Sequence, residues 1–306
     1  MKTLDIILPV YNEELCLDKT IQRLMAVKNE LEGDYAVNFI FVDDGSIDKS
    51  LEILKNHAVN SPFIKIISFS RNFGHQTALW AGIENSQADF MVLIDADLQD
   101  PPEVIKDMLN KAENENAQIV YGKRLKRKNE SWFKKITAYM YYRVFKCLCK
   151  IDMPVDTGDF RLITREVADT LRQMPEKNKF LRGMFAWTGF KSVPLEYERD
   201  ERFAGETKYS LCKMFKLAAD GIFSFSDRPV KFINLAALTL LLCALALTFY
   251  GWQIGFMFFF FAITGLVLFC SALQLFAIGI LGEYLIRIWD NSKNRPVYIV
   301  KSKVNF

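Results

Sequence analysis

The sequence predicts an α/β domain with a mostly parallel sheet, followed by two membrane-spanning helices. Over roughly the first 125 residues, short apolar runs alternate with amphipathic stretches, as in parallel sheets that helices cover on both faces. Short polar motifs follow four of the apolar runs. Farther along, the stretch from Phe232 to Gly282 contains no Asp, Glu, Lys or Arg, which is typical of membrane-spanning segments.

The spacing of apolar residues predicts the individual elements. Near-continuous apolar runs predict buried strands at Leu4 to Val10, Val37 to Asp44, Phe63 to Ser70, Phe90 to Asp97 and Ala117 to Gly122. Amphipathic stretches between them predict helices over about 14–32, 50–58, 76–85 and 102–115. The last twelve residues, "RPVYIVKSKVNF", could add one more short strand.

The polar motifs predict a ligand site, because ligands of parallel sheets bind beyond the carboxyl ends of the strands. The motifs at these ends are Tyr11-Asn12-Glu13, Asp43-Asp44-Gly45-Ser46, Arg71-Asn72 and Asp95-Ala96-Asp97. Asp43 and Asp44 could accept hydrogen bonds from a base or ribose, or one of them could build a turn at Gly45, and both can hold. No GxGxxG follows the first strand, which argues against a dinucleotide cofactor.

Asp95 and Asp97 predict a divalent metal site. If the backbone stays extended, their side chains point to one side and can share a cation. Oxygen ligands select Mg²⁺ or Mn²⁺ over zinc, and such an ion typically also binds substrate phosphates. Asp100 precedes Pro101-Pro102, where its alternative role is to begin the next helix.

The charge-free stretch predicts two membrane spans. Its roughly 50 residues would make one helix about 75 Å long, whereas the bilayer core needs only ~30 Å. A turn at Tyr250 to Gly255 divides it. Basic residues flank it on both sides, at Arg228, Lys231, Arg287, Lys293 and Arg295. The positive-inside rule then places both ends in the cytoplasm. A helical hairpin buried in a soluble core is the alternative.

The distribution of charge points to a membrane rather than to nucleic acid. The net charge of +3 is too small to favour nucleic acid, and basic residues gather at Gly122 to Lys128. This cluster suits anionic lipid or a phosphate-bearing ligand, with a solvated loop as the alternative. Residues 131–150 and 208–225 have apolar residues at helical spacing and are expected to lie in the membrane interface, although 131–150 could instead face a core.

Six motifs carry a resemblance to a known family. In order, "ILPVYNEE", "VDDGSID", "SRNFG", "DADLQDPPE", "GDFRL" and "RFAGETKYS" resemble family 2 glycosyltransferases of the GT-A fold. More narrowly, they resemble the polyprenyl-phosphate glycosyltransferases, the group of bactoprenol glucosyltransferase and dolichol-phosphate mannose synthase. The likeness covers about residues 4–225, and members with two C-terminal spans extend it to nearly the whole chain. "GDFRL" and "RFAGETKYS" are expected beyond the sheet.

The resemblance implies a domain organisation and a location. Residues 1–225 would form a cytoplasmic GT-A domain with the two interfacial helices, 230–285 a two-helix transmembrane hairpin, and 286–306 a cytoplasmic tail. The protein would be a multi-pass protein of the bacterial inner membrane. A homo-oligomer is possible, and its size is open.

The resemblance also implies roles for single residues. Asp95, Asp97 and Gln99 would bind the metal, and Asp97, Asp159 and Arg161 would form the catalytic set. The residues implied in substrate binding are Pro9, Tyr11, Asn12, Glu13, Asp43, Asp44, Arg71, Asp95, Gln99, Arg124, Arg202 and Lys208. Two residues depart from the family pattern: His75 stands where many relatives carry Lys, and Thr207 where Ser is usual.

The implied reaction is metal-dependent, inverting transfer of a hexose from a nucleotide sugar to polyprenyl (undecaprenyl) phosphate, with UDP-glucose as the first choice of donor. GDP-mannose, UDP-N-acetylglucosamine and a UDP-amino-arabinose stay open. The acceptor phosphate is already anionic, so Asp159 is expected to orient a substrate rather than to abstract a proton. The alternative outside enzymes is a membrane-tethered nucleotide-binding regulator, against which the two acceptor-side motifs speak.

Overall fold

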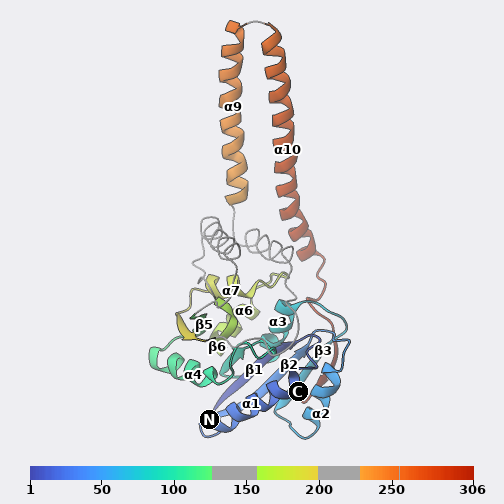
Figure 1. Ribbon diagram of the computed structural model, residues 1–306, viewed down its shortest axis with the longest axis vertical. Helices are drawn as coiled ribbons and strands as arrows, with labels where there is room; N and C mark the ends of the chain where they lie inside the picture. The colour runs from blue at the N-terminus through green and yellow to red at the C-terminus, as the bar shows by residue number, and fades with distance from the viewer. Residues whose placement is uncertain (126–156, 199–227, 255) are drawn as a thin grey trace. The chain divides into compact units, whose positions relative to one another are not determined.

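The computed structural model describes residues 1–125, 157–198, 228–254 and 256–306. They belong to two compact units. One unit holds a sheet and its helices, and the other holds α9 (Arg228–Ile254) and α10 (Phe256–Ser292) (Figure 1). The two stretches expected in the membrane interface, 131–150 and 208–225, lie outside the described residues.

The sheet has eight strands in the order β7-β5-β6-β4-β1-β2-β3-β8. The strands are β1 (Lys2–Val10), β2 (Tyr35–Asp43), β3 (Ile64–Phe69), β4 (Phe90–Leu93), β5 (Ile119–Arg124), β6 (Thr157–Thr164), β7 (Ser192–Tyr197) and β8 (Val300–Val304). β1 pairs in parallel with β2 and β4, β2 with β3, and β5 with β7. The predicted α/β class with a mostly parallel sheet is therefore confirmed, and the C-terminal residues do add a strand.

The position of β6 differs from the expectation. The sequence "GDFRL" was expected beyond the sheet, but it belongs to β6, which lies between β4 and β5 and runs antiparallel to both. Phe160 and Leu162 are fully buried in the core, and the charged residues that alternate with them, Asp159 and Arg161, are buried as well. The strand could not be recognised from the sequence, because buried charged residues interrupt the apolar run that usually indicates a buried strand.

Helices cover both faces of the sheet. They are α1 (Leu17–Leu31), α2 (Ser50–Val59), α3 (His75–Asn85), α4 (Val104–Glu115), α6 (Arg165–Arg172) and α7 (Leu181–Trp187). α1 and α4 share one core cluster with the alternate β1 residues Leu4, Ile6 and Leu8. α3 covers the opposite face and approaches β1 closely, since a Cβ on Gly82 would lie 2.2 Å from the Ile7 side chain. This close packing fixes where α3 begins, next to the predicted ligand site.

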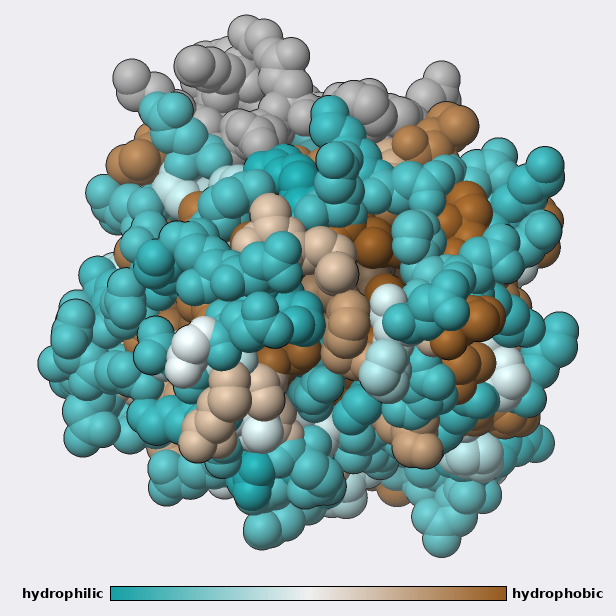
Figure 2. All heavy atoms as spheres, turned by 90° about the horizontal axis from the view of Figure 1, so that it is seen from below, coloured by the Kyte–Doolittle hydropathy of each residue, from teal (hydrophilic) through white to brown (hydrophobic). Residues whose placement is uncertain are grey.

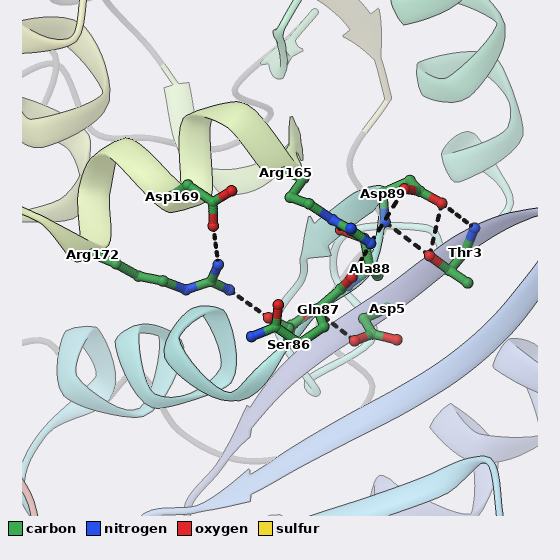
Figure 3. A network of polar contacts seen from close by, with 9 residues as sticks. All are labelled: Thr3, Asp5, Ser86, Gln87, Ala88, Asp89, Arg165, Asp169 and Arg172. Carbon is green, nitrogen blue, oxygen red and sulfur yellow. Dashed lines mark hydrogen bonds and ion pairs between the residues drawn. The ribbon is translucent and has the colours of Figure 1, made fainter.

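A polar network ties α6 to the amino end of β4 (Figure 3). Asp89, directly before β4, accepts hydrogen bonds from the Thr3 backbone N–H and hydroxyl, both at 2.9 Å. The other oxygen of Asp89 lies 3.2 Å from an Nη of Arg165, at the start of α6. Arg172, at the end of α6, donates to the carbonyl oxygen of Ser86. These contacts hold α6, and with it β6, against the middle of the sheet.

α9 and α10 pack against each other within the second unit. Among the described residues, one stretch, Ile263–Ser292, is long and apolar enough to cross a membrane, and the apolar part of α9, Val230–Cys243, is shorter. A turn was expected from Tyr250 to Gly255, but residues 250–254 are helical, because α9 continues to Ile254. α10 begins at Phe256, and the last residue of the expected turn, Gly255, lies outside the described residues. An isolated glycine such as Gly251 is tolerated inside a helix at a cost of only ~1 kcal/mol. Two membrane spans stay a prediction.

The surface in Figure 2 is mostly hydrophilic, with small and separate hydrophobic patches. Single exposed apolar residues such as Ile47 and Val59 are normal on a water-facing surface. By contrast, apolar side chains along α10, such as Leu275 and Ile278, are largely exposed in succession.

Candidate active site

Two loops that follow β1 and β2 interlock at the carboxyl end of the sheet. Asn12 adopts a left-handed backbone (φ 54°), its N–H donates to Ser46 Oγ (3.1 Å), and its Oδ1 accepts from the Ile47 N–H (2.9 Å). The Glu13 N–H donates to Ser50 Oγ (2.9 Å). The structure therefore joins the first two predicted motifs into one framework. Pro9 is buried in β1, and Tyr11 is half-buried directly after it.

Asp43 and Asp44 are both buried and both hold backbone in place. Asp43 accepts from the Ser46 N–H (3.0 Å) and from the Ser68 hydroxyl (2.8 Å). Asp44 accepts from the N–H groups of Phe73 (2.6 Å) and Gly74 (3.0 Å). Burial raises the pKa of Asp44, although these backbone donors counteract the shift. The turn role considered for this pair belongs to Asp43.

The loop that carries Arg71 packs tightly against the Asp44-Gly45 turn. Gly45 has a positive φ of 71°, and a Cβ added there would lie 2.5 Å from the carbonyl carbon of Arg71. Arg71 itself is exposed, with its guanidinium 4.4 Å from the centre of the Phe73 ring. Arg71 is thus available at the surface of the rim, on a loop whose backbone is fixed.

The backbone around Asp95 and Asp97 is not extended, so that expectation is wrong. β4 ends at Leu93, and Leu98 has a left-handed φ of 61°. The Gln99 N–H donates to Asp97 Oδ1 (3.2 Å), so the side chain of Asp97 closes a local turn of the kind that Asp often forms. The chain turns because the carboxylate offers the backbone a partner that the sheet no longer provides.

Asp95 and His75 form the centre of the site. Asp95 keeps 29% of its side-chain surface exposed, and within the described chain its Oδ1 accepts no hydrogen bond. His75, the first residue of α3, places Nε2 3.4 Å from this oxygen and 3.4 Å from Asp159 Oδ2. Burial raises the pKa of Asp95 to about 6, with the other carboxylates adding to it. Burial lowers the pKa of His75, but Asp95 and Asp159 outweigh it and raise the pKa to about 9.

Asp159 is held by three side chains from α3 and α7. Arg182 binds it with two nitrogens, Nε to Oδ1 at 2.8 Å and Nη2 to Oδ2 at 3.0 Å. Gln76 donates to Oδ2 (3.1 Å), and His75 lies beside the same oxygen. Burial alone would raise the pKa of Asp159, but Arg182 and His75 hold it well below its usual range. Asp159 therefore keeps its negative charge near neutral pH.

Gln76 and Arg182 were not predicted as site residues, and His75 was singled out only as a departure from a family pattern. Arg182 lies in "FLRG" near the start of α7, where a lone arginine gives no recognisable signal. His75 and Gln76 follow "SRNFG" directly. Their position at the first turn of the helix after a polar motif was the signal that could have identified them.

Arg161 is buried on β6 beside Asp159. Its Nη2 donates to the Gly158 carbonyl (2.9 Å), and its guanidinium lies 4.4 Å from the centre of the Phe185 ring. Its Nε is buried and has no hydrogen-bond partner among the described residues. Burial lowers the pKa of Arg161 to about 10.

Asp100 does not begin the following helix, which corrects that alternative. The residue before α4 is Glu103, and Asp100 is instead buried and accepts from the Tyr197 hydroxyl (2.5 Å). Arg124 Nη2 lies 4.0 Å from the same carboxylate. Asp100 therefore connects the loop after β4 to the ends of β5 and β7, and it positions Arg124 near the rim.

The donor set fits a divalent ion that also binds a phosphate-bearing ligand. The described residues contain no group of three His, Cys, Asp or Glu side chains arranged to hold a metal alone. Mg²⁺ and similar ions usually need only one or two carboxylates besides substrate phosphates and waters. The unsatisfied Oδ1 of Asp95 and the adjacent carboxylate of Asp97 meet that need. Arg202 and Lys208, the remaining predicted site residues, lie outside the described residues.

A mostly parallel sheet with acidic loops at its carboxyl end is an arrangement that binds ligands in many α/β domains. The chain belongs to the glycosyl transferase family 2, whose family model matches residues 5–172. The protein is therefore a glycosyltransferase, which confirms the family resemblance and the enzyme class.

Relatives match nearly the whole chain. The uncharacterized glycosyltransferase YkcC of Bacillus subtilis (strain 168) is 46% identical, over 97% of this chain and 92% of the relative. The prophage bactoprenol glucosyl transferase homolog of Escherichia coli (strain K12) is 35% identical, over 97% of this chain and 98% of the relative. The bactoprenol glucosyl transferase of Shigella phage SfV is 34% identical, over 98% of each chain.

Solved structures share the fold. A crystal structure of a mycobacterial protein matches with a TM-score of 0.50 and 19% identity, covering 72% of this chain and 73% of that protein. At this level of identity the likeness concerns the fold alone.

Proposed function

We propose that this glycosyltransferase transfers glucose from UDP-glucose to a polyprenyl phosphate, in a metal-dependent and inverting reaction. The product would be a polyprenyl-phosphate β-glucose for modification of cell-envelope glycans. Two of the relatives reported above are named for bactoprenol glucosyl transfer, at 34% and 35% identity over nearly the whole chain. The observation that carries the proposal is Asp95, whose unsatisfied carboxylate oxygen stands beside His75 at the carboxyl end of the sheet.

Asp95, Asp97 and Gln99 are the residues that would hold Mg²⁺ or Mn²⁺. When bound there, the ion supplies a Lewis acid for the departing nucleotide diphosphate. His75 adds a fixed positive charge between two carboxylates, which keeps Asp95 and Asp159 close together in spite of their repulsion. The framework of Pro9, Tyr11, Asn12, Glu13, Asp43, Asp44 and Arg71 would receive the nucleotide.

Asp159 would orient the sugar or the acceptor and would not act as a base. Arg182 engages both of its oxygens, and the depressed pKa keeps it ionised. A carboxylate so strongly stabilised as an anion is a poor proton acceptor. No strong base is needed, because a phosphate acceptor already carries an anionic oxygen. Direct displacement by that oxygen inverts the anomeric centre.

Basic residues would receive the acceptor phosphate. Arg124 stands at the end of β5, and the resemblance adds Arg202 and Lys208. Their charge would offset repulsion between two phosphorylated substrates. We further propose that α9 and α10 both span the bacterial inner membrane with the sheet domain in the cytoplasm, where the phosphate of a membrane lipid is within reach.

A screen of radiolabelled donors against undecaprenyl phosphate tests the proposal. UDP-glucose, GDP-mannose, UDP-N-acetylglucosamine and a UDP-amino-arabinose are each supplied to the purified full chain with Mn²⁺ or with EDTA. We expect labelled lipid from UDP-glucose with Mn²⁺ and none with EDTA. Labelled lipid from another donor alone would correct the sugar. Nucleotide binding without any transfer would favour the membrane-tethered regulator.

The acceptor role has its own test. Arg202→Ala is expected to raise the KM for undecaprenyl phosphate more than the KM for the sugar nucleotide, because it removes a charge opposite the acceptor only. Steady-state kinetics with each substrate varied in turn measure both constants. Equal increases, or a larger increase for the donor, would contradict this role.

A further inference from the structure

The end of the chain returns to the sheet beside the Arg71 loop. β8 pairs antiparallel with β3, from Val304 opposite Ile66 to Val300 opposite Phe69. The contact extends one residue farther, because the Ser70 N–H donates to the Ile299 carbonyl oxygen (3.0 Å). The C-terminal strand therefore fixes the backbone directly before Arg71.

Tyr298 continues this contact through a row of aromatic rings. Its ring stacks on Phe69, with centroids 4.9 Å apart and planes at 25°. Phe69 in turn meets Phe73 edge-on, at 5.6 Å and 86°. Phe73 ends this row, and the Arg71 guanidinium lies over its ring, 4.4 Å from the ring centre. Tyr298 is thus linked to Arg71 by three consecutive ring contacts.

The end of α3 fixes the orientation of the Tyr298 ring. The Tyr298 hydroxyl donates to the carboxylate of Glu84 and accepts from Asn85 Nδ2 (3.1 Å). Lys303, on β8, donates to the Asn85 Oδ1 (2.6 Å). Tyr298 is consequently held both at its hydroxyl and across its ring face.

The Arg71 loop is enclosed from two sides. On one side, Asp44 binds the Phe73 and Gly74 N–H groups and Gly45 packs against the Arg71 backbone. On the other side stand Phe69 and Tyr298. Removing the Tyr298 ring would leave Phe69 and Phe73 free to shift, and the platform under Arg71 would shift with them.

We infer that the C-terminal segment 298–304, which includes β8, is a positioning element for the donor site, in which Tyr298 acts through Phe69 and Phe73 to orient Arg71 toward the nucleoside diphosphate of the donor. This role deepens the proposed function and rests on it, since it takes the Arg71 loop as part of the nucleotide site. Tyr298 is a positioning residue, because it acts through other side chains.

The test uses the full-length protein in detergent with UDP and Mn²⁺ as the probe. Tyr298→Ala removes the stack, whereas Tyr298→Phe keeps the ring and loses only the hydroxyl. Asn305→Ala is the matched control, because Asn305 follows β8 directly whereas Tyr298 precedes it, and Asn305 Nδ2 donates to the carbonyls of Ala58 (3.0 Å), Ser61 (3.3 Å) and Ile64 (2.8 Å). Calorimetry measures UDP affinity, and hydrogen exchange measures the protection of residues 70–74.

Tyr298→Ala is expected to weaken UDP binding about three- to tenfold, the range that one aromatic pair contributes, and to speed exchange at 70–74. Tyr298→Phe should restore both readouts to nearly the wild-type values. Asn305→Ala should lower the Tm without changing either. The inference is overturned if Asn305→Ala affects UDP binding as much as Tyr298→Ala, if Tyr298→Phe behaves like Tyr298→Ala, or if exchange at 70–74 is unchanged in Tyr298→Ala. If the wild type itself binds no UDP, the proposed donor fails, and the exchange data still decide the role of Tyr298.

Discussion

Two aspartates at opposite ends of β4 have opposite environments. Asp89, directly before the strand, has both oxygens engaged, one by Thr3 and the other by Arg165 (Figure 3). Asp95, just beyond the strand, has an oxygen that accepts no hydrogen bond from the described part of the chain. The hydrogen bonds from Thr3 lower the pKa of Asp89, whereas burial raises the pKa of Asp95 to about 6.

The difference matches a structural role for the aspartate before the strand and the proposed ligand-binding role for the aspartate after it. A carboxylate whose partners are all in the protein stabilises the fold and has no capacity left for a ligand. A buried carboxylate oxygen without a hydrogen bond costs free energy, and it persists where a ligand compensates for that cost. Parallel sheets place their ligands at the carboxyl ends of the strands, which is where Asp95 stands.

The largest effect is expected from removing the charge of Asp95. Asp95→Asn should lower kcat about 10²–10³-fold or more, because it removes a proposed ligand of the ion that would stabilise the leaving group. The matched variant Asp89→Asn should keep activity near the wild-type level. Lipid-transfer assays with saturating Mn²⁺ measure both. Equal losses in the two variants would remove the distinction between the two ends of β4.

Asp97→Ala should likewise abolish transfer while the protein still folds and inserts.

Arg182→Met should have the next largest effect. It removes the arginine that binds both oxygens of Asp159. We expect kcat to fall about 10–100-fold, as for other residues that orient a functional side chain through hydrogen bonds. Arg165→Met is the control, since it removes an arginine that pairs with Asp89 at the amino end of β4, away from the candidate site. We expect kcat in Arg165→Met to change little. A fall in KM with unchanged kcat in Arg182→Met would contradict a positioning role for Arg182.

A smaller effect is expected at His75. His75→Lys should retain transfer within about tenfold of the wild type, because it keeps a cation between Asp95 and Asp159, whereas His75→Leu should lose more. The ratio of kcat in the two variants is the measurement. If both variants lose activity equally, the imidazole itself and not its charge would be required.

The smallest effect is expected on the stability of the protein when Asp89, at the amino end of β4, is replaced. Because the folded pKa of Asp89 lies below its unfolded value of about 3.9, its stabilisation is present above that pH and is lost as the pH falls through the folded pKa. The group is partly exposed, so we expect Asp89→Asn to cost only about 0.5–1 kcal/mol at pH 7. Thermal unfolding of both proteins should differ at pH 7 and converge below about pH 3. A constant difference across this range would exclude the charge of Asp89 as the cause.

Most of the sheet could be predicted from the sequence, because the core strands β1, β2 and β3 are continuous apolar runs. β6 could not, since Asp159 and Arg161 interrupt its apolar pattern and their burial depends on partners elsewhere in the chain. The order of strands, with β6 between β4 and β5, is likewise set by long-range pairing that no local pattern records.

The candidate site could be predicted in part. The motifs at the strand ends do converge, and the roles assigned to their residues stay predictions. The predicted extended backbone at Asp95 and Asp97 was wrong. The left-handed Leu98 and the turn at Asp97 depend on local hydrogen bonds that a two-residue spacing does not reveal. Arg182 was missed because its partner, Asp159, is 23 residues earlier in the sequence.

β8 follows α10 in the chain, but in space it is the edge strand of the sheet, next to β3. A truncated protein that stops before α9 would lose this strand and leave the outer N–H and C=O groups of β3 unpaired. Such an open edge is a template for aggregation. A water-soluble version made for crystallisation should therefore keep residues 296–306, either fused through a flexible linker after deletion of α9 and α10 or added as a synthetic peptide.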